Sequence, residues 1–311
     1  MIPVVVIQGP TGVGKSSLAM RLAEELQTEI ISADSRQVYK FLDIGTAKPT
    51  ADEQKKIKHH LIDFITPDLE YSAGVFAKDA SVIIADLHKK GKLPLVCGGT
   101  MFYAKALTDG LFQSQEVPPE YRQKLKQEAA EKGSEFLHAR LAAVDPESAV
   151  RANPNDLSRI IRALEVYEYT GKSITQLWKE FPPKQSRNAF LNILLTDERQ
   201  LLYERINRRV DLMMQQGLIE EFQSVLRMGY DFHHPGLNTV GYRELFPWQK
   251  HERNLEDCVN EIKQHSRNYA KRQITWYRNT VFDLTFSISE IDFHQILERI
   301  ERFRSEIEGE K

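Results

Sequence analysis

Apolar and polar residues follow two alternating patterns through the first hundred positions. Residues 4–8 form an apolar, mostly β-branched run without polar alternation, which is typical of a strand buried on both faces of a parallel sheet. Leu18, Leu22 and Leu26 then recur every four residues, which predicts an amphipathic helix. Further strands are predicted at 29–33, 61–64 and 93–97, with a helix over 76–87. This alternation predicts an α/β fold with an open, mostly parallel sheet flanked by helices.

The pattern becomes all-helical after Gly110. Helices are predicted at 118–133, 134–143 and 156–171. In the last of them Ile160 and Leu164 share an apolar face, between an Asp156 cap and a Gly171 terminator. A strand pattern returns at 191–195, and 281–284 is a candidate edge strand. We therefore predict a core domain of residues 1–112 and 187–311, with an inserted helical domain at residues 113–186.

Composition excludes several classes of protein. The 311 residues are 41% hydrophobic and 28% charged, with a formal net charge of -2, which is typical of a globular chain and not of a collagen-like, coiled-coil or disordered one. No apolar run approaches the roughly 18 residues of a membrane-spanning helix, and no secretion signal is visible before the first strand. Cys97 and Cys258 are too few for a disulfide framework or a zinc cluster. We expect a cytoplasmic protein without a membrane partner, in which any nucleic acid binds a local basic surface.

The segment between the first predicted strand and helix fits the phosphate-binding spacing G-x-x-x-x-G-K-[ST]. It consists of Gly9, Pro10, Thr11, Gly12, Val13, Gly14, Lys15 and Ser16. Its N–H groups can bind phosphate oxygens, Lys15 can reach the outer phosphate, and the Ser16 hydroxyl can ligate Mg²⁺. A glycine-rich turn without a ligand is the alternative, but it has no use for the Lys-Ser pair. The motif predicts a P-loop domain like that of the NTPases, which binds ATP or another di- or triphosphate.

The usual companion for NTP hydrolysis is a strand that ends in an acid. The strand predicted at 93–97 is followed by Gly98, Gly99 and Thr100, without a carboxylate. Asp63 is a weaker alternative beside His59 and His60, a pair that we interpret as structural because no third metal ligand lies near it in the sequence. The sequence therefore indicates a phosphate binder with incomplete hydrolytic equipment.

Asp34 ends the second predicted strand. Ligands of open α/β sheets bind outside the carboxyl ends of the strands, so Asp34 should face the same crevice as the P-loop. Its carboxylate could accept a proton from a nucleophile or ligate a metal-bound water. A turn-forming Asp that bonds its own backbone is the alternative. The polar run at 34–39 favours a substrate-reading loop.

Residues 262–280 contain no acid. Cations are interleaved there with aromatic rings: Lys263, Arg267, Tyr269, Lys271, Arg272, Trp276, Tyr277 and Arg278. Phosphates attract the cations and unstacked bases stack on the rings, so this stretch is a candidate RNA surface. Lys263, Arg267 and Lys271 would form a stripe at helical spacing. The alternative is a solvated amphipathic face.

These motifs resemble those of the tRNA dimethylallyltransferases, over nearly the whole chain. The matching blocks are residues 9–16, 31–39, 43–49, 98–103, 159–166, 240–244 and 271–276. The resemblance implies that the P-loop binds the diphosphate of dimethylallyl diphosphate, and that N6 of the adenosine next to the anticodon (position 37) attacks C1 of the prenyl group. It implies Asp34 as the base. Mg²⁺ on Ser16, with Lys15, Thr11 and one arginine, would balance the leaving diphosphate; Arg209 is the implied arginine and Arg205 its rival.

The resemblance also implies which residues contact the tRNA anticodon stem-loop. They are Asp34, Ser35, Arg36, Gln37, Thr100, Met101, Arg122, Arg159, Arg162, Arg243, Lys271, Arg272 and Gln273. We expect the chain to act as a monomer.

Two other functions are compatible with the motifs. A P-loop small-molecule or nucleoside kinase would use Asp34 to activate a hydroxyl. A non-catalytic RNA binder would use the P-loop as a nucleotide switch. Dimethylallyl diphosphate should raise the melting temperature of a dimethylallyltransferase, whereas ATP or GTP should raise that of a kinase or of an RNA binder with a nucleotide switch.

Overall fold

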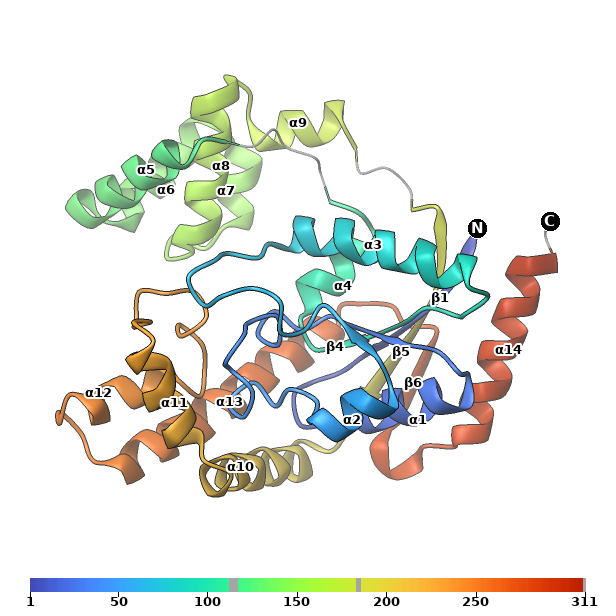
Figure 1. Cartoon of the computed structure of the whole chain (residues 1–311). Coiled ribbons are helices and arrows are strands. Elements are labelled where there is room, and N and C mark those ends of the chain that lie inside the picture. Colours follow the sequence, from blue (N-terminus) through green and yellow to red (C-terminus); the bar gives the residue numbers. More distant parts are fainter. Residues whose placement is uncertain (112–116, 183–185, 310–311) are drawn as a thin grey trace. The chain divides into compact units, whose positions relative to one another are not determined.

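The computed structural model describes residues 1–111, 117–182 and 186–309 (Figure 1). The chain divides into two compact units, Met1–Thr108 with Ser186–Lys311, and Asp109–Gln185. The expected first boundary, between 112 and 113, lies outside the described residues. None of the described helices is long and apolar enough to span a membrane.

The first unit is built on a six-stranded sheet in which every pairing is parallel. Its order is β3-β2-β4-β1-β5-β6. The strands are β1 Ile2–Gln8, β2 Ile30–Ser32, β3 His59–His60, β4 Leu95–Gly98, β5 Asn188–Thr196 and β6 Leu284–Ser287. Central β1 pairs with β4 and β5, and Val4 and Ile7 in it are fully buried, which explains its unbroken apolar run. The predicted α/β class and parallel sheet are confirmed.

Two predicted strands were misplaced. The third strand is His59–His60, because Leu61 and Asp63 have φ values of 60° and 56°, which extended backbone does not allow. The edge strand begins at Leu284, three residues after the predicted start. Asp283, just before this strand, holds it to β5 with two hydrogen bonds. Its N–H donates to the Asn192 carbonyl, and its carboxylate accepts the Asn192 N–H.

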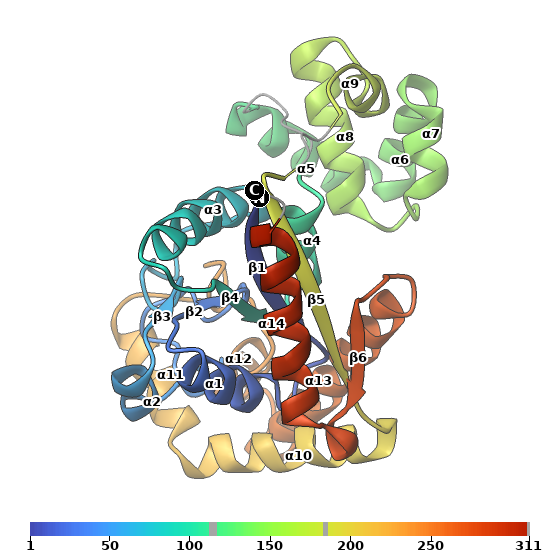
Figure 2. The ribbon, with the colours of Figure 1, turned by 90° about the vertical axis from the view of Figure 1, so that its right-hand side faces the viewer.

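The helices of the first unit pack either on this sheet or in a second core beside it. They are α1 Lys15–Glu25, α2 Ala51–Lys56, α3 Ala73–Lys89, α4 Met101–Thr108, α10 Arg199–Gln215, α11 Leu218–Arg227, α12 Phe246–Gln249, α13 Leu255–Tyr277 and α14 Phe293–Gly309. In Figure 2, α14 runs along β1 and β5, where Ile296 and Ile300 join the core of Leu22 and Ile7. A second core forms where the loop after β2 packs on α10 to α13, with Leu42 and Tyr242 fully buried in it.

The second unit is all-helical, as expected. Its helices are α5 Pro119–Lys132, α6 Ser134–Val144, α7 Pro146–Arg151, α8 Leu157–Thr170 and α9 Ile174–Glu180. The Asp156 carboxylate caps α8 by accepting the Arg159 N–H, and Gly171 ends it with a φ of 71°. The short helices α7 and α9 were not predicted. Each has a start signal, an Asp145 cap before Pro146 and a Ser173–Gln176 capping box.

Candidate active site

The P-loop joins β1 to α1. Gly14 precedes the helix with a φ of 101°, a left-handed conformation that a side chain would strain. Lys15 turns back over the loop, and its Nζ donates to the Pro10 carbonyl at 2.8 Å. Ser16 is exposed in the first turn of α1. The loop therefore has the shape that its sequence predicted for a phosphate cradle.

Two helices from distant parts of the sequence hold Thr11. Arg209 of α10 donates from Nη2 to the Thr11 hydroxyl at 2.9 Å, and the Thr11 N–H donates to Oε1 of Gln273 on α13 at 2.8 Å. Arg205, the rival of Arg209, forms an ion pair with Asp197 instead. Among the described residues the buried Nε of Arg209 has no hydrogen-bond partner. The structure thus brings Arg209, and not Arg205, to the P-loop.

Burial shifts the charge equilibria of these cations. It lowers the pKa of Lys15 to about 8, although the nearby Cys97 and Asp34 act in the opposite direction. Burial also lowers the pKa of Arg209, again opposed by Asp34. A buried cation that lacks a close anion favours binding one, and a diphosphate in the loop would supply that anion.

Asp34 follows β2 at the edge where β1 leads into the P-loop. One carboxylate oxygen, Oδ1, accepts the Arg36 N–H at 2.8 Å, so the turn expected of the alternative interpretation is present. The charge of the same carboxylate opposes the lowering of the pKa of both Lys15 and Arg209, which places it within electrostatic reach of the cradle. The turn and a role at the cradle are therefore compatible, because the turn uses a single oxygen.

The loop after β4 contacts the turn that contains Asp34. A Cβ on Gly98 would lie 2.1 Å from the Ala33 carbonyl oxygen, so only glycine allows the ends of β4 and β2 to approach. Thr100 Oγ1 accepts the Ser35 N–H at 2.9 Å, directly beside Asp34. No carboxylate follows β4. Asp63 pairs with Lys48 at 2.9 Å, so it does not replace the missing acid.

Gln273 lies differently from the expectation. It was predicted to contact tRNA, but its side chain is 0% exposed. Its Nε2 donates to the Gly99 carbonyl at 2.7 Å while its Oε1 holds Thr11. Two tyrosines of α13 flank it, with the Tyr269 hydroxyl 3.5 Å from the same carbonyl and the Tyr277 hydroxyl 3.3 Å from the Gly9 carbonyl. Gln273 thus links the two loops inside the protein, and in this structure it has no exposed surface for the tRNA contact predicted for it.

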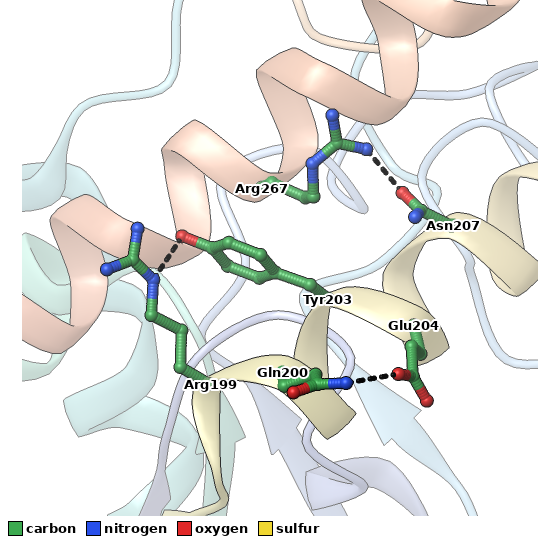
Figure 3. A pocket seen from close by; sticks show the side chains of 6 residues that line it. All are labelled: Arg199, Gln200, Tyr203, Glu204, Asn207 and Arg267. Carbon is green, nitrogen blue, oxygen red and sulfur yellow. Dashed lines mark hydrogen bonds between the residues drawn. The ribbon is translucent and has the colours of Figure 1, made fainter.

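The predicted basic stripe on α13 is divided between two environments. Lys263 and Arg267 face α10, where they bond Asp211 and Asn207 at 2.5 Å each. Figure 3 shows Arg267 over the groove that also contains Tyr203. Lys271 and Arg272 are exposed and line a hollow with Asn268 and Thr275. Of the predicted cations on this helix, this pair is therefore open to a ligand.

The other predicted tRNA contacts are partly engaged within the protein. Arg36 donates to the Pro235 carbonyl at 3.2 Å, and Gln37 to that of Ala47 at 3.0 Å. Arg243 bonds the buried Glu244 at 2.7 Å. Met101 is partly buried at the start of α4.

The helical unit holds three further predicted arginines. Arg122 and Arg162 both bond Glu165, which is 2% exposed, and Arg159 pairs with Asp156 at 3.2 Å while remaining 66% exposed. Arg159 is thus the most open of the three.

Glu221 is a residue that the sequence analysis missed. Its carboxylate accepts the N–H groups of Asp43, Ile44 and Gly45 and the Tyr242 hydroxyl. It thereby fixes the loop after β2. A glutamate on an amphipathic helix gives no sequence signal of this, because the three N–H groups that it accepts lie 176 to 178 positions away.

No group of three or more His, Cys, Asp or Glu side chains is arranged to hold a metal among residues 1–111, 117–182 and 186–309. His60 bonds Glu29 at 2.7 Å, in agreement with its structural interpretation. A metal at the P-loop would therefore depend on Ser16, substrate oxygens and water.

Comparisons with known proteins show which family this sequence matches. A model of the IPP transferase family matches residues 37–280. A tRNA dimethylallyltransferase of Acetivibrio thermocellus is 45% identical over 276 residues, 88% of each chain. One of Thermoanaerobacter sp. is 43% identical over 304 residues, 96% of each chain.

Solved structures are similar over the same extent. A full-length tRNA isopentenylpyrophosphate transferase of Bacillus halodurans has a TM-score of 0.70 at 36% identity, covering 99% of this chain and 96% of that one. A eukaryotic dimethylallyltransferase acting on tRNA has a TM-score of 0.79 at 29% identity, covering 93% and 74%. Since both the family model and these relatives span most of its length, the chain belongs to the IPP transferase family.

Proposed function

We propose that this protein transfers a dimethylallyl group from dimethylallyl diphosphate to N6 of the adenosine at position 37 of tRNA, releasing diphosphate. The relatives named above are tRNA dimethylallyltransferases, which supports the activity. The observation that carries it in the structure is a P-loop with two partly buried cations beside Asp34, but without the acid that an NTP hydrolase has at the end of a strand such as β4.

Asp34 acts as the base in this proposal. The N6 lone pair forms the bond to C1 of the prenyl group, the C1–O bond breaks with its electron pair going to diphosphate, and one N6 proton passes to Asp34. The amine is a weak nucleophile because its lone pair is delocalised into adenine, so a base that relieves its growing positive charge accelerates attack. Oδ2 is the candidate acceptor, since Oδ1 holds the Arg36 N–H.

Lys15, Arg209 and the Thr11 hydroxyl would hold the diphosphate. The unpartnered Nε of Arg209 and the lowered pKa of Lys15 support this assignment, since both groups gain from an anion. Mg²⁺ fits the exposed Ser16 hydroxyl, with its other ligands from diphosphate and water, and it would neutralise charge on the leaving group.

The exposed Lys271 and Arg272, with Arg159 of the helical unit, are the best supported contacts for the phosphates of the anticodon stem-loop. The target base must leave its stack to reach Asp34, and such contacts offset the unstacking free energy. We place the reaction in the cytoplasm and expect a monomer.

Mass spectrometry of tRNA adenosine, after incubation with the protein and dimethylallyl diphosphate, tests the proposal directly. Formation of N6-dimethylallyl adenosine at position 37 is the expected result. A kinase would instead consume ATP, and its melting temperature would rise with ATP and not with dimethylallyl diphosphate.

Metal removal tests the role of Ser16. We expect excess EDTA to abolish transfer and added Mg²⁺ to restore it, because the diphosphate would otherwise leave with its charge unbalanced. Full activity in excess chelator would contradict the metal role.

A further inference from the structure

The amide of Gln273 joins two loops that are far apart in the sequence. Oε1 accepts the Thr11 N–H at 2.8 Å, and Nε2 donates to the Gly99 carbonyl at 2.7 Å. A backbone N–H only donates and a carbonyl only accepts, so these partners fix which end of the amide is which. Glutamine is suited to this position because it offers one donor and one acceptor in a single planar group.

Both loops belong to the candidate active site. Thr11 carries the hydroxyl that Arg209 contacts, and its loop is the diphosphate cradle. Gly99 precedes Thr100, whose hydroxyl accepts the Ser35 N–H beside Asp34. A series of hydrogen bonds, joined by the peptide bond between Gly99 and Thr100, therefore leads from the cradle, through Gln273, to the turn that contains Asp34.

We propose that Gln273 is a positioning residue that sets the distance between the diphosphate cradle and Asp34. It acts through Thr11 and Gly99, and it contacts neither substrate. The inference rests on the proposed function, since it assigns to Asp34 and the P-loop the two halves of one reaction. It also explains why a residue with no exposed surface lies directly after the exposed Lys271 and Arg272.

Gln273→Ala removes both hydrogen bonds. We expect the single-turnover rate to fall on the order of 10- to 100-fold, since small misplacements of reacting groups have effects of that size. The dissociation constant for inorganic diphosphate should rise about fivefold or more, because the Thr11 loop loses its support. Affinity for tRNA should stay within about twofold. Gln264→Ala, an exposed glutamine on the same helix, is the matched control and should change none of these.

Gln273→Glu keeps the shape of the side chain and protects the test against a folding failure of the alanine variant. A carboxylate still accepts the Thr11 N–H but faces the Gly99 carbonyl with a second acceptor, whereas a protonated carboxyl restores the donor. Burial favours the protonated form, so the rate relative to wild type should be low at about pH 8 and rise toward pH 6. The charged and titratable groups around this position are Lys15, Asp34, Cys97, Arg209, Tyr269 and Tyr277. Wild type carries all of them, so its pH profile, measured in parallel, gives their own contribution to the rate.

Melting temperatures of all variants, measured alongside, separate a misplaced loop from an unfolded chain. Rates and diphosphate affinities within twofold of wild type in both Gln273 variants would overturn the proposal. A loss confined to tRNA affinity would return Gln273 to the tRNA contacts, and a pH-independent rate ratio for Gln273→Glu would exclude the Gly99 bond as the positioning contact. If wild type fails to prenylate tRNA, the proposed function fails, but the diphosphate measurement still decides whether Gln273 supports the P-loop.

Discussion

The two units of this protein differ in whether their partly or fully buried charged side chains form ion pairs within the protein. In the core unit, Lys15 and Arg209 form no ion pair with a carboxylate of the described residues, and burial lowers the pKa of both. In the helical unit, Glu165 is 2% exposed and takes Arg122 at 2.8 Å and Arg162 at 2.6 Å. Burial raises the pKa of Glu165, but its bonds to both arginines outweigh this and leave the pKa below its ordinary value.

This difference distinguishes cations that can bind a ligand from cations that stabilise the fold. Burying a cation without a close anion destabilises the fold, so a chain keeps such cations where a ligand supplies the anion. A cation that a buried acid neutralises inside the protein stabilises helix packing instead. Arg122, which was predicted to contact tRNA, therefore also holds α5 against Glu165 of α8, and Arg162 adds a bond to the same glutamate within α8.

The largest expected effect is at Asp34, the carboxylate whose charge acts on both Lys15 and Arg209. Asn keeps the shape and can still accept the Arg36 N–H, but it cannot take a proton from N6. We expect Asp34→Asn to fold and to bind both substrates within a few fold, with a single-turnover rate reduced on the order of 10²-fold or more. A rate within about threefold of wild type would leave Asp34 as a turn former, since Asn is among the best residues for that role.

A substitution of Arg209 tests whether the P-loop cations bind a ligand, in contrast to the paired arginines of the helical unit. Arg209→Gln should raise the dissociation constant for dimethylallyl diphosphate about tenfold or more, the effect of one lost charge-assisted hydrogen bond. Arg208→Gln, the exposed neighbour on α10, makes the same charge change and should leave affinity unchanged. Equal effects of the two variants would mean that α10 acts through general positive charge alone.

Lys271 and Arg272, on the exposed face of α13, should contribute to RNA binding and not to diphosphate binding. Lys271→Glu with Arg272→Glu should weaken tRNA binding about tenfold and lower the slope of log affinity against log salt by about two, while diphosphate affinity stays intact. Lys55→Glu with Lys56→Glu on α2 is the control with the same total charge change. If both double variants weaken tRNA equally, α13 is only a solvated helix face.

The sequence predicts those parts of the fold that have a local cause. The P-loop, the sheet class, and the caps of α8 each follow from a few adjacent residues, and all lie where expected. The short helices α7 and α9 were not predicted, because six or seven residues show too little hydrophobic periodicity. Their capping residues are nevertheless visible in the sequence. The strand predicted at 61–64 failed because Leu61 and Asp63 adopt left-handed backbone that an apolar run does not announce.

Pairing partners could not be predicted in this way. The resemblance implied that Gln273 contacts tRNA beside Lys271 and Arg272, yet helix geometry turns its side chain into the protein while those two stay exposed. The choice between Arg205 and Arg209 depended on Asp197, which lies just after β5. Such contacts join positions that tertiary structure alone brings together.

The smallest effect should come from Glu165, and it should appear in stability. Glu165→Gln leaves the guanidinium groups of Arg122 and Arg162 without their shared anion. Breaking a buried ion pair has a large effect, but these arginine side chains are 42% and 37% exposed, so solvent screening reduces the loss to about 1–2 kcal/mol.

We expect this loss to lower the melting temperature of the full chain by a few degrees at neutral pH, with diphosphate affinity within twofold of wild type. The sign of the pH dependence follows from the lowered pKa of Glu165. Its charge stabilises the fold above its ordinary pKa of 4.5, and that contribution is lost as the pH falls through the lower folded value. The difference in melting temperature between wild type and Glu165→Gln should therefore shrink as the pH drops below about 4.5. Two results would contradict a purely stabilising role of Glu165. One is a difference in melting temperature that stays constant from pH 7 to pH 3, and the other is a loss of diphosphate affinity equal to that of Arg209→Gln.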